Sequence, residues 1–230
     1  KSRRTILINV NGLIKINKDL LKLYLVTDRY LCGKLGTIDT VKQAVMGGVT
    51  CVQLRDKDCT TNELIRYGKH IKEFLDQNNI PLIVNDNLEA AIQIGASGIH
   101  VGQSDMKVSD IRATIGSSMI VGLSCENLEQ AKLVDNRDVD YVGISPLFTT
   151  PTKHDHSIPI GMQGLSDMIQ LLDLPCVAIG GIKVEHCREI FSRGASGVAV
   201  ISAICGQPSP EMAARRFRNE IKSFEKDPND

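Results

Sequence analysis

Eight short and almost continuously apolar runs recur along the chain and constrain its fold more than any other feature. They occupy residues 23–26, 50–54, 82–84, 98–101, 119–122, 140–143, 176–179 and 197–200. Runs of this length that are apolar at nearly every position are typical of parallel strands buried on both faces. Longer segments with helically spaced apolar residues separate them, so the pattern predicts a repeated β–α unit.

The repeated unit predicts a single α/β domain built as a (β/α)8 TIM barrel. The similar segments 94–99 and 193–198 (IGASGI and RGASGV) both read as a helix end followed by a tight turn into a strand. An open doubly wound sheet is the main competitor, but it usually has fewer strands, and no GxGxxG motif follows the first run. We expect an N-terminal extension packing on the barrel at 1–22, the barrel catalytic domain at 23–224, and a flexible tail at 225–230.

Composition excludes several classes of function. Lys and Arg number 27 and Asp and Glu number 27, so the formal net charge is zero. Such a chain has no global positive field for nucleic acid or an anionic membrane, and no apolar run reaches the roughly 18–20 residues of a membrane helix. The seven cysteines form no CxxC motif, so we expect reduced thiols and a cytoplasmic location. The chain could also form a homo-oligomer, which the sequence does not decide.

Polar residues gather directly after the apolar runs, which is where barrel enzymes place their chemistry. The candidates are Gln53 near the end of the second run with Arg55 and Lys57 after it, Asn85 and Asp86 after the third, Asp105 after the fourth, Ser124 after the fifth, and Thr150, Thr152 and Lys153 in the irregular connection 145–164 after the sixth. The glycines Gly180 and Gly181 follow the seventh run, and Ile201 and Ser202 follow the eighth. The opposite ends of the runs carry prolines and glycine turns instead. This one-sided distribution predicts a functional site at a single end of the barrel.

The spacing of Gln53, Arg55 and Lys57 places all three side chains on one side of an extended backbone. Two cations and an amide suit a polyanion, although an exposed charged strand end is the simpler alternative. Asp86 and Asp105 follow adjacent runs, and their oxygens suit Mg²⁺ beside a phosphate ligand. Both aspartates could equally begin loops or cap helices, so the metal site stays open at this point.

A second anion site is indicated by the glycines after the seventh run and by Ile201–Ser202 after the eighth, where barrels often bind phosphate through backbone N–H groups. Tight-turn glycines are the alternative. His100 lies inside a run and is interpreted as a hydrogen-bonded core residue. No Ser/His/Asp triad or Cys/His nucleophile emerges, so diphosphate ligands without a nucleophile point to pyrophosphate as a leaving group.

Eight motifs around these residues occur in a fixed order. They are YLVTD at 24–28, VQLRDK at 52–57, LIVND at 82–86, GIHVGQSD at 98–105, VGISP at 142–146, TPTK at 150–153, AIGGI at 178–182 and VISAI at 200–204. Together they resemble the thiamine phosphate synthase family from about residue 23 to residue 204. The resemblance implies a transferase that condenses 4-amino-5-hydroxymethyl-2-methylpyrimidine diphosphate with hydroxyethylthiazole phosphate to give thiamine monophosphate and pyrophosphate.

The resemblance also implies a role for each candidate residue. Gln53, Arg55, Lys57, Asn85, Ser124 and Lys153 would hold the pyrimidine diphosphate, Asp86 and Asp105 would hold Mg²⁺, and Thr150, Thr152, Gly181, Ile201 and Ser202 would hold the thiazole phosphate. It implies a dissociative reaction in which Mg²⁺, Arg55, Lys57 and Lys153 stabilise the departing pyrophosphate. An isomerase resembling the thiazole tautomerase relatives and a non-catalytic phosphometabolite-binding module are the alternatives. Neither needs the paired aspartates together with the lysines and arginine.

Overall fold

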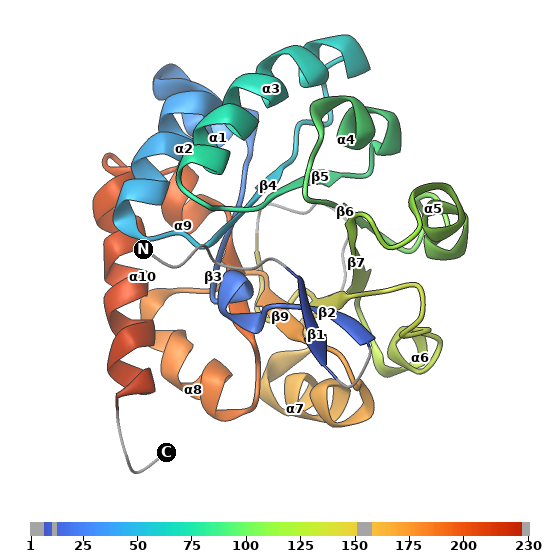
Figure 1. Cartoon of the computed structure of the whole chain (residues 1–230). Coiled ribbons are helices and arrows are strands. Elements are labelled where there is room, and N and C mark those ends of the chain that lie inside the picture. Colours follow the sequence, from blue (N-terminus) through green and yellow to red (C-terminus); the bar gives the residue numbers. More distant parts are fainter. Residues whose placement is uncertain (1–6, 11–12, 151–157, 227–230) are drawn as a thin grey trace.

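The chain forms a closed barrel of eight parallel strands with helices around the outside, as a computed structural model shows (Figure 1). The structure describes residues 7–10, 13–150 and 158–226. The barrel strands run in the order β10-β3-β4-β5-β6-β7-β8-β9. Their bounds are β3 Leu23–Val26, β4 Cys51–Leu54, β5 Leu82–Asn85, β6 Gly98–Val101, β7 Ile120–Cys125, β8 Tyr141–Ile144, β9 Cys176–Ile179 and β10 Gly197–Val200. The predicted (β/α)8 barrel is confirmed.

Four predicted strands have the predicted bounds, and the other four differ at one or both ends. The largest difference is β7, which continues to Cys125 because Ser124 and Cys125 still pair with Gly143 and Ile144 of β8. Ser124 therefore lies within a strand, where the sequence had placed it in the following loop. Gln53 and Asn85 likewise belong to β4 and β5, so the barrel itself fixes the backbone of these side chains.

The helices cover the outer face of the barrel and surround the strands in the view of Figure 1. They are α1 Arg29–Cys32, α2 Gly36–Gly47, α3 Thr61–Gln77, α4 Leu88–Ile94, α5 Val108–Ile115, α6 Leu128–Lys132, α7 Gly161–Leu171, α8 Cys187–Ser192, α9 Ser202–Cys205 and α10 Pro210–Glu225. Short 3-10 turns occupy Lys18–Leu21, Gly33–Leu35 and Val184–His186. The predicted capping box is present, because Thr60 Oγ1 accepts from the Glu63 N–H and the Glu63 carboxylate accepts from the Thr60 N–H.

The core has two layers because each strand is buried on both faces. Aliphatic side chains between the strands and the helices form the larger layer, which includes Val52, Val84 and Val142. A smaller cluster fills the inside of the barrel and contains Tyr24 and Tyr141, which are 1% and 0% exposed. These two tyrosines bring hydroxyl groups into the interior, and both hydroxyls require hydrogen-bond partners there.

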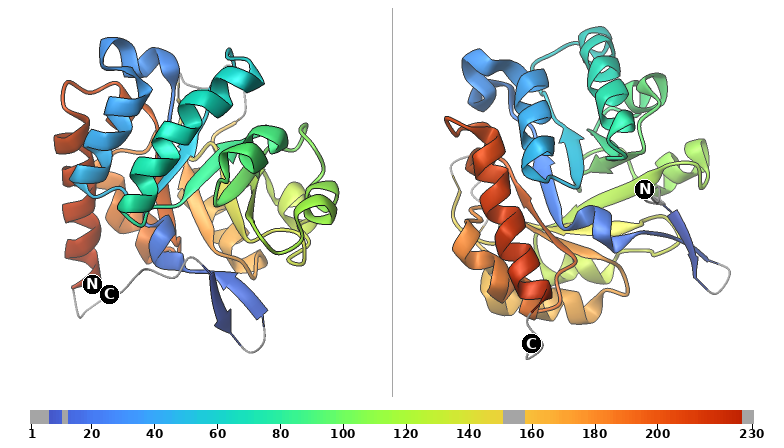
Figure 2. Two further views of the ribbon diagram at one scale, coloured as in Figure 1. Left: turned by 45° about the horizontal axis from the view of Figure 1, so that its top comes forward. Right: turned by 60° about the vertical axis from the view of Figure 1, so that its left-hand side comes forward.

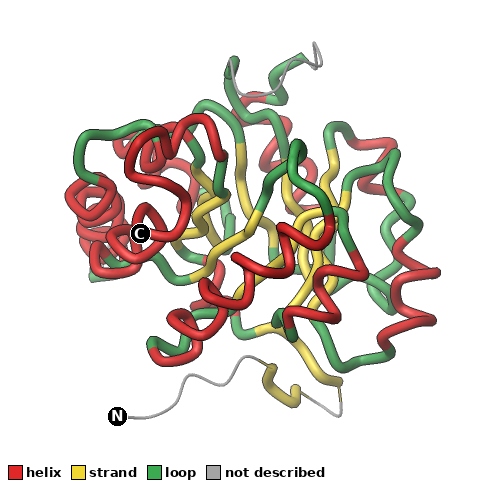
Figure 3. Tube along the Cα trace, turned by 90° about the horizontal axis from the view of Figure 1, so that it is seen from above, coloured by secondary structure: helices red, strands yellow, loops and turns green. Residues whose placement is uncertain are grey.

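The segment before the barrel contributes side chains to its interior. A two-stranded antiparallel sheet, β1 Leu7–Val10 with β2 Leu13–Ile16, lies outside the ring of helices (Figures 2 and 3). Ile16 and the fully buried Leu21 join the cluster inside the barrel. Leu21 lies just before β3, so these apolar side chains fill the end at which the strands begin.

Several smaller features also bear on the sequence analysis. The irregular connection after β8 is shorter than predicted, since α7 begins at Gly161. All seven cysteines are free thiols, and six of them are buried. None of the helices in the described part of the chain has both the length and the apolar character required to cross a membrane.

Candidate active site

Arg55 is held at the end of β4 by the loop that follows β3. The hydroxyl of the fully buried Thr27 accepts a hydrogen bond from the Arg55 N–H (3.0 Å) and donates one to the Arg55 carbonyl (3.2 Å). Asp28 caps α1 with one carboxylate oxygen, and the other oxygen lies 3.8 Å from Arg55 Nη1. Neighbouring strands thus orient the guanidinium, which is what a bidentate diphosphate contact requires.

Asp86 and Asp105 come together beside Lys57. The pKa of Asp86 is raised to about 6, first by burial and then by its hydrogen bond to Asp105 and the negative charge of that group, while the Lys57 ammonium acts in the lowering direction. Asn85 Nδ2 donates to Asp86 Oδ2 at 2.5 Å. On the other side, Asp105 Oδ2 accepts from the Gly102 N–H at 2.7 Å. The structure therefore brings together residues from three successive strand ends.

The backbone of Asp86 is unusual for a residue that is not glycine. Its φ is +59°, in the left-handed region that side chains with a Cβ seldom adopt. Its N–H is held by the His100 carbonyl on β6, at 2.9 Å. Conformations of this kind cost free energy and persist where the surroundings impose them, commonly at functional sites. At this position the carboxyl group of Asp86 is hydrogen-bonded to that of Asp105.

The aspartate pair fits a divalent cation. Burial raises the pKa of Asp86 most and the neighbouring Asp105 raises it further, and a cation between the two carboxylates would relieve their repulsion. Within the described ranges, no group of three or more His, Cys, Asp and Glu gathers around one point. A cation here would take two carboxylates and otherwise oxygens of water or ligand, which is the coordination that Mg²⁺ favours.

The predicted phosphate site lies at the same end of the barrel, after β8, β9 and β10. Thr150, Gly181, Ile201 and Ser202 line one small cavity of about 60 Å³. Gly181 has a φ of +64°, and a Cβ there would lie 2.8 Å from both Phe148 Cβ and Thr149 O. Only glycine fits that contact, so the backbone of the β9 loop closes directly against the β8 loop. Ser202 begins α9, whose first N–H groups have no intrahelical partner.

A line of hydrogen-bonded side chains crosses the interior of the barrel beneath these loops. Gln53 Nε2 donates to Tyr24 OH (3.0 Å), and the hydroxyls of Tyr24 and Tyr141 lie 2.8 Å apart. His100 Nδ1 lies 2.9 Å from Tyr141 OH, and His100 Nε2 lies 2.9 Å from Ser124 Oγ. We refer to these five residues as the interior chain. His100 is a hydrogen-bonded core residue, as predicted. The interior chain joins two candidate binding residues, Gln53 on β4 and Ser124 on β7.

Sequence reasoning missed Tyr24 and Tyr141. A signal was present, because each is a single tyrosine inside a short apolar strand whose other residues are aliphatic or glycine. Thr152 and Lys153 lie outside the described residues, and so does the part of the connection that carries them. The other candidates follow the carboxyl ends of their strands or occupy the last residues of them, and they share one end of the barrel.

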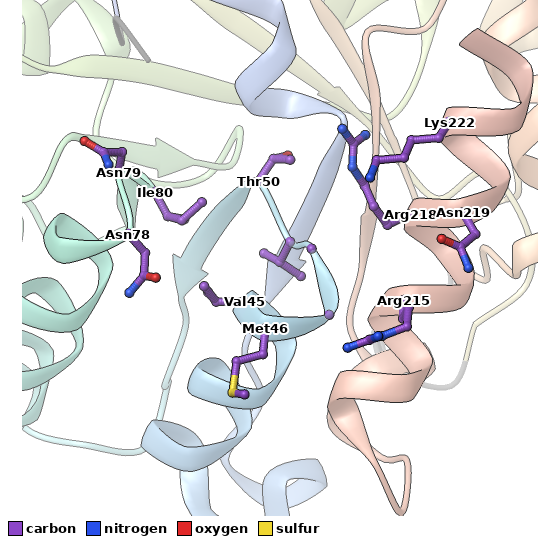
Figure 4. A pocket seen from close by; sticks show the side chains of 13 residues that line it. Val45, Met46, Thr50, Asn78, Asn79, Ile80, Arg215, Arg218, Asn219 and Lys222 are labelled. Carbon is purple, nitrogen blue, oxygen red and sulfur yellow. The ribbon is translucent and has the colours of Figure 1, made fainter. Parts of the chain in front are cut away.

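A second cavity lies at the opposite end. It has a volume of about 660 Å³ and is lined by the ends of α2 and α3 together with α10 (Figure 4). Val49 and Thr50 precede β4, and Ile80 precedes β5, so the cavity opens where the strands begin. Arg215, Arg218 and Lys222 of α10 line its other wall. In barrels that end of the sheet contributes stability, whereas the chemistry takes place at the carboxyl ends.

Comparison with known proteins agrees with this geometry. The chain matches the family model described as "Thiamine monophosphate synthase" over residues 23–204, which include every barrel strand. This chain belongs to the thiamine monophosphate synthase family. It is 43% identical to a thiamine-phosphate synthase of Albidiferax ferrireducens over 201 residues, covering 87% of this chain and 92% of that protein. It is 40% identical to a thiamine-phosphate synthase of Azorhizobium caulinodans, covering 88% and 96%.

Solved structures extend the family relationship to three dimensions. A thiamine phosphate pyrophosphorylase from Pyrococcus furiosus superposes with a TM-score of 0.83 at 30% identity, covering 90% of this chain and 98% of that one. A 3-hexulose-6-phosphate synthase, at 16% identity and a TM-score of 0.66, shares the fold alone. This member of the thiamine monophosphate synthase family is thus an enzyme with the architecture of its relatives.

Proposed function

We propose that the chain condenses the aminopyrimidine diphosphate with the thiazole phosphate to give thiamine monophosphate and pyrophosphate. Its relatives bear the names of enzymes that form thiamine phosphate. The observation that carries the proposal is the meeting of Asp86, Asp105 and Lys57 at one end of the barrel. The small cavity with Gly181 and Ser202 lies at the same end, so two phosphate-bearing substrates would be held side by side.

Charge stabilisation and positioning would perform the reaction, because no nucleophile is required when the leaving group departs first. Arg55 and Lys57, and Lys153 outside the described residues, would bind the diphosphate and stabilise the charge that develops as the carbon–oxygen bond breaks. Asp86 and Asp105 would hold Mg²⁺, which supplies charge neutralisation on the departing pyrophosphate when bound. The electron-rich aminopyrimidine would stabilise the methylene cation until the thiazole nitrogen attacks.

The phosphate on the other substrate would serve for positioning. Backbone N–H groups of the β9 loop and the start of α9, together with the Thr150 and Ser202 hydroxyls, would hold the thiazole phosphate in the small cavity. Fixing both reactants at one end of the barrel would replace an encounter in solution with a reaction between neighbours. Such positioning contributes several kcal/mol, on the order of 7–11 in the best cases.

The aspartate pair separates this function from its alternatives. An isomerase of the same fold acts on one substrate without releasing pyrophosphate, and a phosphate-binding module has no use for a metal. The raised pKa of Asp86 indicates that placing its carboxylate beside that of Asp105 is unfavourable. The synthase reaction accounts for this arrangement, because it would use a metal ion held between the two groups. The proposed partners are accordingly the two small-molecule substrates, with neither nucleic acid nor membrane involved.

The test is to mix the purified chain with both substrates and Mg²⁺ and to follow thiamine monophosphate and pyrophosphate together. We expect equal amounts of both products, and we expect the metal-chelated protein and Asp86→Asn to lose about 10²-fold or more in rate. Pyrophosphate without thiamine monophosphate would indicate hydrolysis, and no product from either assay would reject the proposed function. Full activity of Asp86→Asn would reject the metal role alone.

A further inference from the structure

The interior chain can carry its hydrogens in only two ways. Each link between Gln53, Tyr24, Tyr141, His100 and Ser124 uses one hydrogen, and each hydroxyl that donates to one neighbour accepts from the other. Neutral histidine has one N–H and one bare nitrogen, so it passes the same direction onward. The five groups therefore point together from Gln53 to Ser124, or together from Ser124 to Gln53.

With Nε2 of the Gln53 amide facing Tyr24 OH, as the structure has it, the interior chain takes the first direction. Gln53 Nε2 donates to Tyr24 OH at 3.0 Å, so the Tyr24 hydroxyl donates to Tyr141, and Tyr141 donates to His100 Nδ1. The remaining hydrogen of the ring then lies on Nε2 and is donated to Ser124 Oγ, 2.9 Å away. The interior chain would end with a free acceptor, Gln53 Oε1, at β4 and with a free donor, the Ser124 hydroxyl hydrogen, at β7.

Burial makes this arrangement expensive to disturb. Tyr24, Tyr141, Gln53 and His100 are all at most 4% exposed, so a broken link leaves a polar group without water to replace its partner. Burial also raises the pKa of both tyrosines well above their usual value, which keeps the two hydroxyls protonated. Both hydroxyls can therefore donate one hydrogen bond and accept another.

Gly122 keeps the path of the interior chain open. A Cβ at this position would lie 2.2 Å from Tyr141 Cζ and 2.5 Å from His100 Nδ1. The two rings therefore meet across the one place on β7 where a side chain is absent. This gap is an independent sign that the path is built into the barrel, because any other residue would separate His100 from Tyr141.

We propose that Tyr24, Tyr141 and His100 are positioning residues that fix Gln53 as a hydrogen-bond acceptor and Ser124 as a donor toward the pyrimidine. This inference rests on the proposed function, which places the pyrimidine diphosphate at Gln53 and Ser124. The amino edge of an aminopyrimidine carries an N–H donor next to a bare ring nitrogen, which is complementary to one acceptor and one donor. A 4-oxo analogue carries the opposite pattern at that edge, with an oxygen and a ring N–H, and would meet like groups.

The activity test uses Tyr141→Phe, which removes one hydroxyl and two links while keeping the ring. We expect kcat/KM for the pyrimidine diphosphate to fall about 10–100-fold and KM for the thiazole phosphate to stay within about twofold. We also expect the preference for the 4-amino substrate over its 4-oxo analogue to shrink by about tenfold. A role in stability alone would not change that preference.

The matched control is Tyr67→Phe. Its hydroxyl is also partly buried and donates to Asp56 Oδ2 at 3.0 Å, but it lies on α3 outside the barrel interior. We expect its substrate preference to equal that of the unmodified chain. If Tyr141→Phe fails to fold, Tyr24→Phe breaks the same chain one link earlier and is expected to show the same loss of preference. The proposal would be overturned if folded Tyr141→Phe or Tyr24→Phe kept the full preference for the 4-amino substrate. An equal loss of that preference in Tyr67→Phe would also overturn it.

A measurement without substrate keeps this inference separate from the proposed function. Nitrogen-15 NMR of the histidine rings, with His100 assigned through His100→Gln, reports which nitrogen bears the hydrogen. We expect the Nε2–H form in the unmodified protein and a mixture or the other form in Tyr141→Phe. The Nδ1–H form in the unmodified protein would overturn the stated direction of the chain, whether or not the protein makes thiamine monophosphate.

Discussion

Asp86 combines three properties that each cost free energy. Its φ is +59°, it is half-buried, and its pKa is raised to about 6 by burial and by Asp105. A residue kept only for stability would not retain all three. The combination is understandable if the pair is arranged for a positive charge that arrives with the substrates.

Removing one carboxylate of the pair should stabilise the metal-free protein while destroying its activity. In Asp105→Asn the repulsion on Asp86 disappears, so we expect the Tm in chelator at neutral pH to rise by about 3 °C. Synthase activity should fall about 10²-fold or more. Differential scanning calorimetry and the product assay measure the two effects, and a lowered Tm would contradict the assigned repulsion.

The pH dependence of stability follows from the same shift. The pKa of Asp86 rises from 3.8 to about 6 on folding, so the native state binds this proton more tightly than the unfolded state does. Ionisation of Asp86 therefore lowers stability as the pH rises from about 4 to about 6, and the loss is complete above that window. In chelator, the difference in free energy of unfolding between Asp86→Asn and the unmodified chain should grow in favour of the variant mainly between those pH values. A difference that does not vary with pH would contradict the shift.

At the scale of single elements, the loop after β9 determines the shape of the phosphate cavity. Gly181 combines a positive φ with contact distances that exclude a Cβ. Both the backbone conformation and the lack of space for a Cβ therefore require glycine at this position of the β9 loop. The glycine end of α4 differs in that respect, because Gly95, which follows α4, has a positive φ and no heavy atom within 4 Å of its missing Cβ.

Gly181→Ala should consequently impair binding of the thiazole phosphate. The new methyl group would push the β8 and β9 loops apart by a few tenths of an ångström or more, so we expect KM for that substrate to rise about 10-fold or more. Gly95→Ala is the matched control: it has a similar φ of +70° and open space, and it should lose about 1 kcal/mol of stability with unchanged KM. Steady-state kinetics with the thiazole phosphate varied tests both, and equal KM values would reject the role of the loop.

The positions of the strands and helices were largely predictable from the sequence, whereas the contacts between side chains of different strands inside the barrel were not. Parallel strands buried on both faces leave an apolar run, so the strand positions could be read locally, and Thr60 with Glu63 marked a helix start. Asp86 and Asp105 could be placed at one end because strand direction alone decides it. The link from Tyr24 to Tyr141 depends on which strands face each other across the barrel and at what height. Ser124 was placed in a loop because its hydroxyl gives no sign that β7 continues.

For the whole molecule, the two ends of the barrel have separate tasks. The end where the strands begin is filled by Ile16 and Leu21, and the other end carries the charged and glycine-rich loops. Changes at one end should thus alter stability, and changes at the other should alter catalysis. The described residues before β3 therefore contribute to stability.

Leu21→Ala tests that division. Leu21 is fully buried inside the barrel, so its truncation should lower the free energy of unfolding by about 3 kcal/mol through lost burial and a cavity. The KM values of both substrates should remain within about twofold. Urea unfolding and steady-state kinetics at a temperature where the variant is folded give the two numbers. A large rise in either KM would show that the ends are coupled.

The barrel closes where Val198 of β10 pairs with Leu23 of β3, two residues from nearly opposite ends of the sequence. A ribosome making this chain must therefore translate past residue 200 before the first strand gains its last neighbour. Until then the nascent sheet has an open edge that could pair with another polypeptide. Chaperone capture during synthesis should accordingly persist until the final β–α unit has emerged, and a fragment that ends before β10 should not assemble a working enzyme.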